Sequence, residues 1–163
     1  MNSVSSLLKF SVLPILLIGA EVSLFIHPVR SNSNPIQLAD ARTCRKAISA
    51  AHNKLNQVKN VRVSFFYNSQ HGYDRYPINR TMSYDFALAG SGVGNVLSSP
   101  VFMRDISTQI ISNCASIGIV SFGRAHTDTG ETYGLMPKNG RVEAFKCLTP
   151  SANEIPWGYT ICL

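Results

Sequence analysis

Apolar residues recur at helical spacing in two parts of the chain. Between Leu38 and Val58 they stand three or four positions apart, and most basic residues lie off this stripe. The same spacing follows Pro100 as far as Asn113, after two serines that suit a helix start. A period near 3.6 residues is typical of a helix with one buried face. We therefore predict two amphipathic helices in these segments.

Five other segments favour strands because they are short, apolar and rich in β-branched and aromatic residues. The first two alternate between apolar and mostly polar positions, which is the pattern of a half-buried strand. An Asn-Gly pair at 139–140 favours a tight hairpin between the last two. The predicted strands are 61–67, 81–88, 117–122, 131–136 and 141–148.

The predicted elements follow the order α-β-β-α-β-β-β. This order favours an α+β fold in which two helices pack on one face of an antiparallel sheet. A glycine-rich stretch at 89–95 separates the two halves. It has neither the Lys-Ser/Thr pair of a P-loop nor the spacing of a dinucleotide fingerprint, so we interpret it as a flexible connector.

The N-terminus carries an apolar run, residues 7–26, with Lys9 near its start. A basic residue followed by an apolar run is typical of a secretory signal peptide. The run is also long enough for a membrane anchor, although Pro14 and Glu21 disfavour a stable span. A buried core helix is a third interpretation. We expect residues 1–31 to be a signal peptide or anchor, 32–37 a linker and 38–163 a single exported domain.

Four cysteines follow the apolar run, and they are even in number and widely spaced. This usage is typical of disulfides in an oxidising compartment, so we expect a secreted or periplasmic protein. No cysteine or histidine spacing is typical of a zinc site, and we expect neither metal nor cofactor. Three pairings are possible. We favour Cys44–Cys114, which would tie the first helix to the end of the second, and Cys147–Cys162, which would close the C-terminal tail.

The formal net charge is +6, and the excess is concentrated between Ala41 and Tyr73, a stretch without acidic residues. One interpretation is a solvated helix face. The other is a binding patch for an anionic polysaccharide, a lipid surface or an acidic protein. We expect no nucleic acid because no recognised motif is present. The basic residues are Arg42, Arg45, Lys46, Lys54, Lys59 and Arg62.

Two polar loops carry candidate chemistry. In the first, His126 and Asp128 stand two positions apart near Arg124, and a histidine beside a carboxylate can act as a general base. An exposed turn is the simpler interpretation, and no G-x-S-x-G elbow supports a serine nucleophile. In the second loop, His71 stands near two tyrosines and an arginine, which are residue types of binding hot spots: Tyr73, Arg75 and Tyr76. A surface loop with some packing is the simpler interpretation.

Four strings, SFG at 121–123, TYGLM at 132–136, VEAFKC at 142–147 and WGYTIC at 157–162, stand in this order and spacing. Over residues 80–163 the chain therefore resembles an uncharacterised group of small exported proteins of cyanobacteria. The resemblance implies an exported, disulfide-bearing domain and carries over no catalytic residue. We expect a non-enzymatic binding domain of the envelope or extracellular space. The alternatives are a small secreted hydrolase that uses His126 and Asp128, or a secreted proteinaceous inhibitor.

Overall fold

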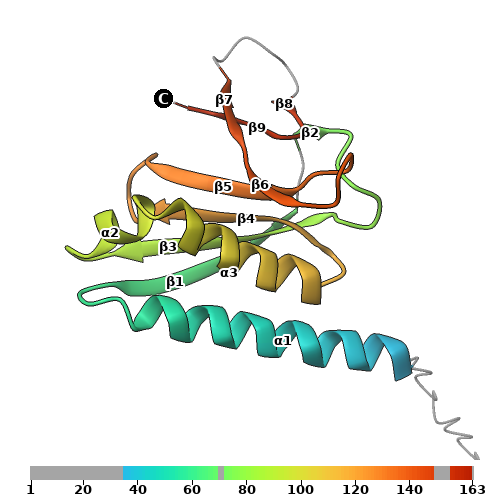
Figure 1. Ribbon diagram of the computed structural model, residues 1–163, viewed down its shortest axis with the longest axis horizontal. Helices are drawn as coiled ribbons and strands as arrows, with labels where there is room; N and C mark the ends of the chain where they lie inside the picture. Colours follow the sequence, from blue (N-terminus) through green and yellow to red (C-terminus); the bar gives the residue numbers. More distant parts are fainter. Residues whose placement is uncertain (1–34, 70–71, 149–154, 163) are drawn as a thin grey trace, which may run out of the picture. The chain divides into compact units, whose positions relative to one another are not determined.

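The computed structural model describes three stretches of the chain, residues 35–69, 72–148 and 155–162 (Figure 1). The predicted signal peptide or anchor lies outside these residues. The first helix begins at Pro35, inside the stretch 32–37 that we expected to be a linker. Proline suits the first turn of a helix. The N–H groups of this turn have no acceptor within the helix, so the N–H that proline lacks costs no hydrogen bond. Within the described residues, no helix combines the length and apolar character that a membrane crossing needs.

The described residues form three helices and nine strands. The helices are α1 (Pro35–Asn56), α2 (Val93–Leu97) and α3 (Pro100–Asn113). The strands are β1 (Arg62–Ser69), β2 (Tyr73–Asp74), β3 (Met82–Ala89), β4 (Ile117–Arg124), β5 (Gly130–Leu135), β6 (Val142–Ala144), β7 (Lys146–Leu148), β8 (Ile155–Pro156) and β9 (Tyr159–Ile161). The predicted glycine-rich connector therefore contains the start of α2, and the predicted C-terminal tail contains two short strands.

Five strands form one sheet in the order β1-β3-β4-β5-β6. β1 and β3 pair antiparallel, and β4, β5 and β6 form an antiparallel meander. The prediction of an antiparallel sheet is wrong at one position, because β3 and β4 pair parallel and the sheet is mixed. The cause is the connection: α2 and α3 carry the chain back along the sheet, so β4 starts at the same end as β3.

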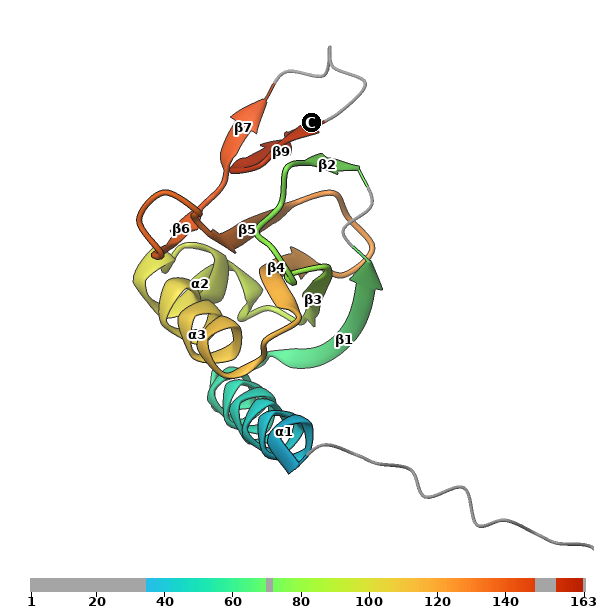
Figure 2. The ribbon, with the colours of Figure 1, turned by 90° about the vertical axis from the view of Figure 1, so that its right-hand side faces the viewer.

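The helices lie on one face of this sheet, and the main core fills the space between them (Figures 1 and 2). α1 contributes the small and aliphatic residues of its apolar stripe, and α3 contributes four large apolar side chains. The sheet contributes alternate residues of its three central strands. The fully buried members include Ala51, Leu55, Met103, Ile106, Ile110, Tyr84, Phe86, Leu88, Val120, Phe122 and Tyr133.

A second, smaller cluster covers the opposite face of the sheet. The predicted strand 141–148 divides into β6 and β7 at Phe145, whose ring lies over Gly134 so closely that a side chain there would collide with it. The Phe145 ring also contacts Tyr73 and Trp157. The Trp157 indole N–H donates to the Leu135 carbonyl at 2.9 Å. This aromatic contact pulls the chain out of the sheet and explains why one predicted strand is two.

Both predicted disulfides are confirmed. Cys44 of α1 is bonded to Cys114 at the end of α3, with their Cα atoms 4.5 Å apart. Cys147 of β7 is bonded to Cys162, just after β9, with Cα atoms 5.4 Å apart. The first bond ties the two main helices together, and the second holds the parallel pair β7 and β9.

One half-buried guanidinium group, that of Arg80, caps the C-terminal end of α3. Arg80 Nη1 donates toward three carbonyl oxygens, those of Ile111 and Cys114 at 2.7 Å and that of Ile117 at 2.9 Å. The last carbonyl groups of a helix have no partner within the helix, and their partial negative charge favours a cation. Arg80 therefore satisfies the end of α3 and the start of β4 at the same time.

A histidine of α1 reaches into the aromatic part of the core. His52 Nε2 lies 2.6 Å from the hydroxyl of Tyr84, which is fully buried. Its ring packs edge-on against Phe65 and Phe86. Burial lowers the pKa of His52 and raises the pKa of Tyr84. Both groups are therefore neutral in the folded protein, and their hydrogen bond joins α1 to the centre of the sheet.

We predict that Arg80→Met lowers the free energy of unfolding by about 3 kcal/mol, because several charge-assisted bonds to carbonyl groups are lost together. Arg80→Lys should lower the free energy of unfolding less, because an ammonium group keeps the positive charge. Some loss should remain, because lysine lacks the planar guanidinium group. Arg141→Met is the control, because Arg141 is exposed and its side chain has no described polar partner. Urea unfolding followed by circular dichroism measures all three. Equal stability of the Arg80→Met and Arg141→Met variants would contradict the capping role.

We also predict a pH dependence that depends on His52. Its pKa is lower in the folded protein than the ordinary 6.5, so the unfolded chain binds the proton more readily. The contribution of neutral His52 to the free energy of unfolding is complete above pH 6.5 and declines as the pH falls below that value. The free energy of unfolding should therefore decrease more between about pH 7.5 and pH 5 in the wild type than in His52→Gln. His126→Gln, at an exposed histidine, should keep the wild-type dependence.

Candidate functional site

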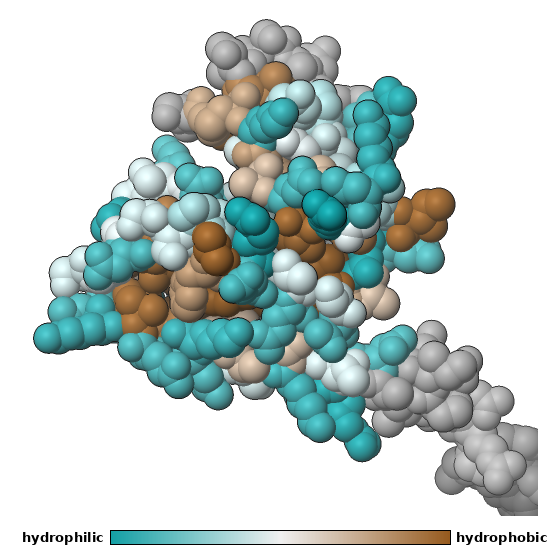
Figure 3. Space-filling model, viewed as in Figure 1, coloured by the Kyte–Doolittle hydropathy of each residue, from teal (hydrophilic) through white to brown (hydrophobic). Residues whose placement is uncertain are grey.

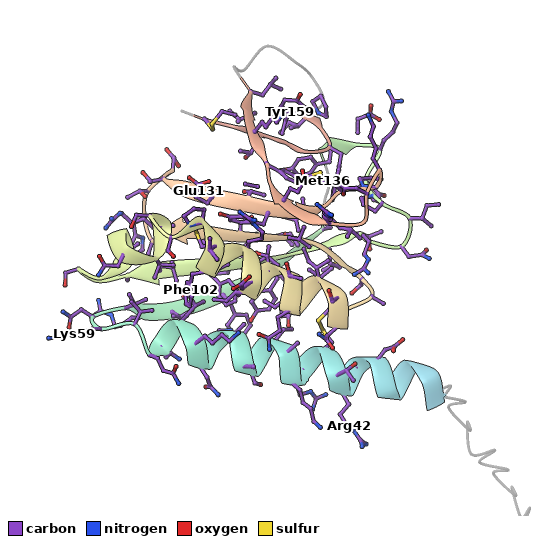
Figure 4. All side chains as sticks on the ribbon, in the orientation of Figure 1. Arg42, Lys59, Phe102, Glu131, Met136 and Tyr159 are labelled. Carbon is purple, nitrogen blue, oxygen red and sulfur yellow. A yellow bond between two sulfur atoms is a disulfide. The ribbon has the colours of Figure 1, made fainter. Side chains whose placement is uncertain are left out.

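Three basic residues near the start of α1 lie on one exposed surface of the helix. Arg42, Arg45 and Lys46 are three and four positions apart, so their side chains emerge from the same side of adjacent turns. We call these three residues the basic face. They border a shallow hollow of about 720 Å³, whose other lining residues are Ala41, Ser49, Ala50 and Asn53. Figure 4 shows Arg42 projecting away from the sheet.

The charges of the basic face have no carboxylate partner among the described residues. Throughout the residues that the structure describes, the one ion pair within 4.0 Å joins Arg75 to its neighbour Asp74. All three basic side chains are exposed, and Figure 3 shows hydrophilic residues along α1 on the side in view. Unpaired cations gathered on one surface create a local positive potential that attracts anionic groups.

The other three residues of the predicted basic patch lie elsewhere. Lys54 donates to the side chain of Gln109 on α3 at 3.1 Å. Lys59 lies beyond the C-terminal end of α1, at the opposite end of the helix from Arg42 (Figure 4). Arg62 begins β1. The structure therefore brings three of the six predicted basic residues together and places the other three farther along the chain, between residues 54 and 62.

The predicted His126 and Asp128 loop connects β4 to β5 as a tight turn. His126 is exposed and adopts a left-handed conformation with φ of 62°. Asp128 lines a groove of about 580 Å³, whereas His126 and Arg124 do not. The groove is rich in hydroxyl groups, including the pair Ser121 and Thr132, whose oxygens lie 3.4 Å apart. The structure thus places a carboxylate among hydroxyl groups but shows no hydrogen bond between it and His126.

The second predicted loop divides between the interior and the surface. His71 lies outside the described residues. Tyr73 packs its ring against Phe145 and Trp157, and burial raises its pKa. Arg75 is exposed and pairs with Asp74 at 3.0 Å. Tyr73 therefore belongs to the smaller aromatic cluster, and Arg75 lies at the rim of a hollow of about 530 Å³ beside Trp157.

A further surface lies between α1 and β1, and the sequence pattern did not reveal it. Phe65 and Tyr67 of β1 face the helices but are 48 % and 50 % exposed. Tyr67 lines a groove of about 600 Å³ together with Cys44, Arg45 and Ile48 of α1. Alternation predicted that these aromatic residues share one face. It could not show that the strand lies at the edge of the sheet, where helices cover that face only in part.

No three side chains among the described His, Cys, Asp and Glu residues gather as metal ligands. Comparison of the chain with family models, with curated proteins and with solved structures finds no match.

Proposed function

We propose that this chain is an exported binding domain that holds an anionic polysaccharide on the basic face of α1. The observation that carries the proposal is the hollow bordered by Arg42, Arg45 and Lys46, three cations without a described acidic partner. Carboxylate or sulfate groups repeated along a polysaccharide match such a row of cations. Ser49 and Asn53, which line the same hollow, can donate to and accept from sugar hydroxyl groups.

The residues between the charges favour a polysaccharide over the other anionic partners. A helix that lies in a lipid surface needs large apolar side chains to insert, and this hollow has none among its lining residues. Protein interfaces are also commonly centred on aromatic anchors, and no aromatic residue lines this hollow. Alanine, serine and asparagine leave room for a flat, hydrated polymer to approach the backbone.

Export is part of the same proposal. Two disulfides join four cysteines, and disulfides persist in oxidising compartments outside the cytoplasm. The apolar run at residues 7–26, which follows a basic residue, supports export through a signal peptide. The resemblance to small exported proteins of cyanobacteria points the same way. A domain outside the cell meets acidic polysaccharides as a regular part of its surroundings.

We predict that the chain binds alginate, a carboxylated polysaccharide, and does not bind neutral dextran. Arg42→Gln, Arg45→Gln and Lys46→Gln combined should weaken alginate binding roughly ten-fold, since each exposed charge pair contributes up to about 1 kcal/mol. Binding should also weaken as salt rises, because the Debye length falls to about 3 Å at 1 M. Isothermal titration calorimetry or an affinity column measures both effects.

The matched control replaces Lys138, Arg141 and Lys146 by glutamine, which removes the same net charge from exposed positions far along the chain. This variant should bind alginate almost as well as the wild type. Equal loss in both triple variants would assign the attraction to net charge alone. Binding to anionic vesicles of phosphatidylglycerol without binding to alginate would favour a lipid surface and overturn the proposal.

A further inference from the structure

The turn between β5 and β6 carries the one asparagine of the chain that is followed by glycine. Asn139 and Gly140 are both exposed, so water reaches them from solvent. Gly140 has a left-handed φ of 65°, which glycine adopts readily. A Cβ atom added to it would meet no heavy atom within 4 Å beyond its chain neighbours. The backbone is thus unhindered on the side where a side chain would stand.

An asparagine side chain before glycine can lose its amide group without an enzyme, which is one reason why asparagine is a thermolabile residue. The Gly140 backbone nitrogen attacks Cγ of Asn139, and the new N–Cγ bond closes a succinimide ring. The Cγ–Nδ2 bond breaks, and ammonia leaves with the proton that the Gly140 nitrogen releases. Water then opens the ring at either carbonyl and returns a proton to this nitrogen. The product is aspartate or isoaspartate at position 139.

Three hydrogen bonds fix the reacting groups in the folded turn. The Gly140 N–H donates to the Met136 carbonyl at 2.9 Å. Asn139 Nδ2 donates to Glu143 Oε1 at 2.9 Å, and Asn139 Oδ1 accepts from the Arg141 N–H at 3.0 Å. The first two bonds must break, because the Gly140 nitrogen loses its proton and Nδ2 leaves. The third can remain, since Oδ1 stays on Cγ, and its N–H stabilises the negative charge that develops on this oxygen.

We propose that Asn139 is a deamidation site that the folded turn holds back, and that Glu143 is the side chain that restrains it. Glycine leaves the attacking nitrogen unhindered, and the Arg141 N–H is in place to polarise the side-chain carbonyl of Asn139. The bonds to Met136 and Glu143 keep the same groups in an unreactive arrangement. The reactants are this amide and water alone, so the modification needs no partner. It goes beyond the function proposed for the basic face.

Deamidation removes the bond that restrains it. A carboxylate at position 139 has no N–H to donate, and it places a second negative charge beside the Glu143 carboxylate. Asn139 and Glu143 also line the hollow beside Trp157, whose lining has two cations, Arg75 and Lys138, and two carboxylates. The reaction adds a third carboxylate to this balanced set. Because ammonia is lost to solvent, the hollow stays more negative once the turn has reacted.

The test follows deamidation of the folded chain and of the reduced chain in guanidinium chloride, both in near-neutral buffer. Mass spectrometry of peptic fragments locates each converted asparagine. In the unfolded wild type, Asn139 should react before any other asparagine. In the folded wild type it should react roughly ten-fold more slowly, because two hydrogen bonds must break first. Gly140→Ala should slow the reaction in the unfolded chain, since the alanine side chain hinders the attacking nitrogen.

Glu143→Ala should speed deamidation of Asn139 in the folded chain roughly five-fold, because the acceptor for Nδ2 is lost. Glu143→Gln keeps an acceptor oxygen at the same place and should leave the rate close to that of the wild type. Glu131→Ala is the matched control, since it removes an exposed carboxylate from β5 and should not change the rate. Circular dichroism checks that each variant is folded, and none of the three should change the rate in the unfolded chain.

Asn139→Asp mimics one product of the reaction. It should lower the midpoint of thermal unfolding, because two carboxylates then meet in the turn. Glu143→Gln in the same chain should restore the midpoint, since glutamine donates an N–H to the new carboxylate. Thermal unfolding followed by circular dichroism measures both variants.

Four outcomes would overturn the proposal. They are equal rates in the folded and unfolded chains, equal rates in folded Glu143→Ala and Glu131→Ala, earlier reaction of another asparagine in the unfolded chain, and equal midpoints of Asn139→Asp with and without Glu143→Gln. Alginate is absent from these experiments, and neither Asn139 nor Glu143 belongs to the basic face. Their outcome is therefore independent of the function proposed there.

Discussion

The C-terminal end of α3 is the point where the main elements of the fold are joined. The Arg80 guanidinium, which precedes β3, donates to carbonyl groups at the end of α3 and the start of β4. Cys114, whose carbonyl is one of these acceptors, is bonded to Cys44 of α1. One cation and one disulfide therefore fasten both long helices to β3 and β4. Without them, α3 would end in unpaired carbonyl groups beside the core.

This junction also determines which surfaces remain open. Because α2 and α3 cross over the sheet, β4 lies beside β3 and leaves β1 at the edge. α1 is bonded to the end of α3 and follows β1 along the same face (Figure 1). Its apolar stripe is thereby buried, and its basic face is turned to solvent. The groove and the basic face are thus two consequences of one arrangement of α1.

Local patterns in the sequence predict the elements well, and the cysteines predict their links. The helical stripe of α1, the alternation in β3 and both disulfide pairings agree with the structure, whereas β1 forms a strand that is exposed at seven of its eight residues. Contacts between distant segments have no such local signal. The parallel pairing of β3 and β4 depends on the path of a connection, and the break at Phe145 depends on Gly134 beneath its ring. The open side of Phe65 depends on which strand is outermost.

The candidate sites show the same division between local and distant information. Spacing along α1 predicts that Arg42, Arg45 and Lys46 share a surface, since residues three and four apart are neighbours on a helix. It cannot predict that Lys54 turns to Gln109 of α3. The disulfide at Cys44 adds a constraint on α1 that this spacing does not predict. It lies between Arg42 and Arg45 and fixes the backbone of the turn that carries them to the end of α3. A ligand that binds a rigid backbone loses less affinity to ordering, so the disulfide favours the basic face as the surface for the function proposed above.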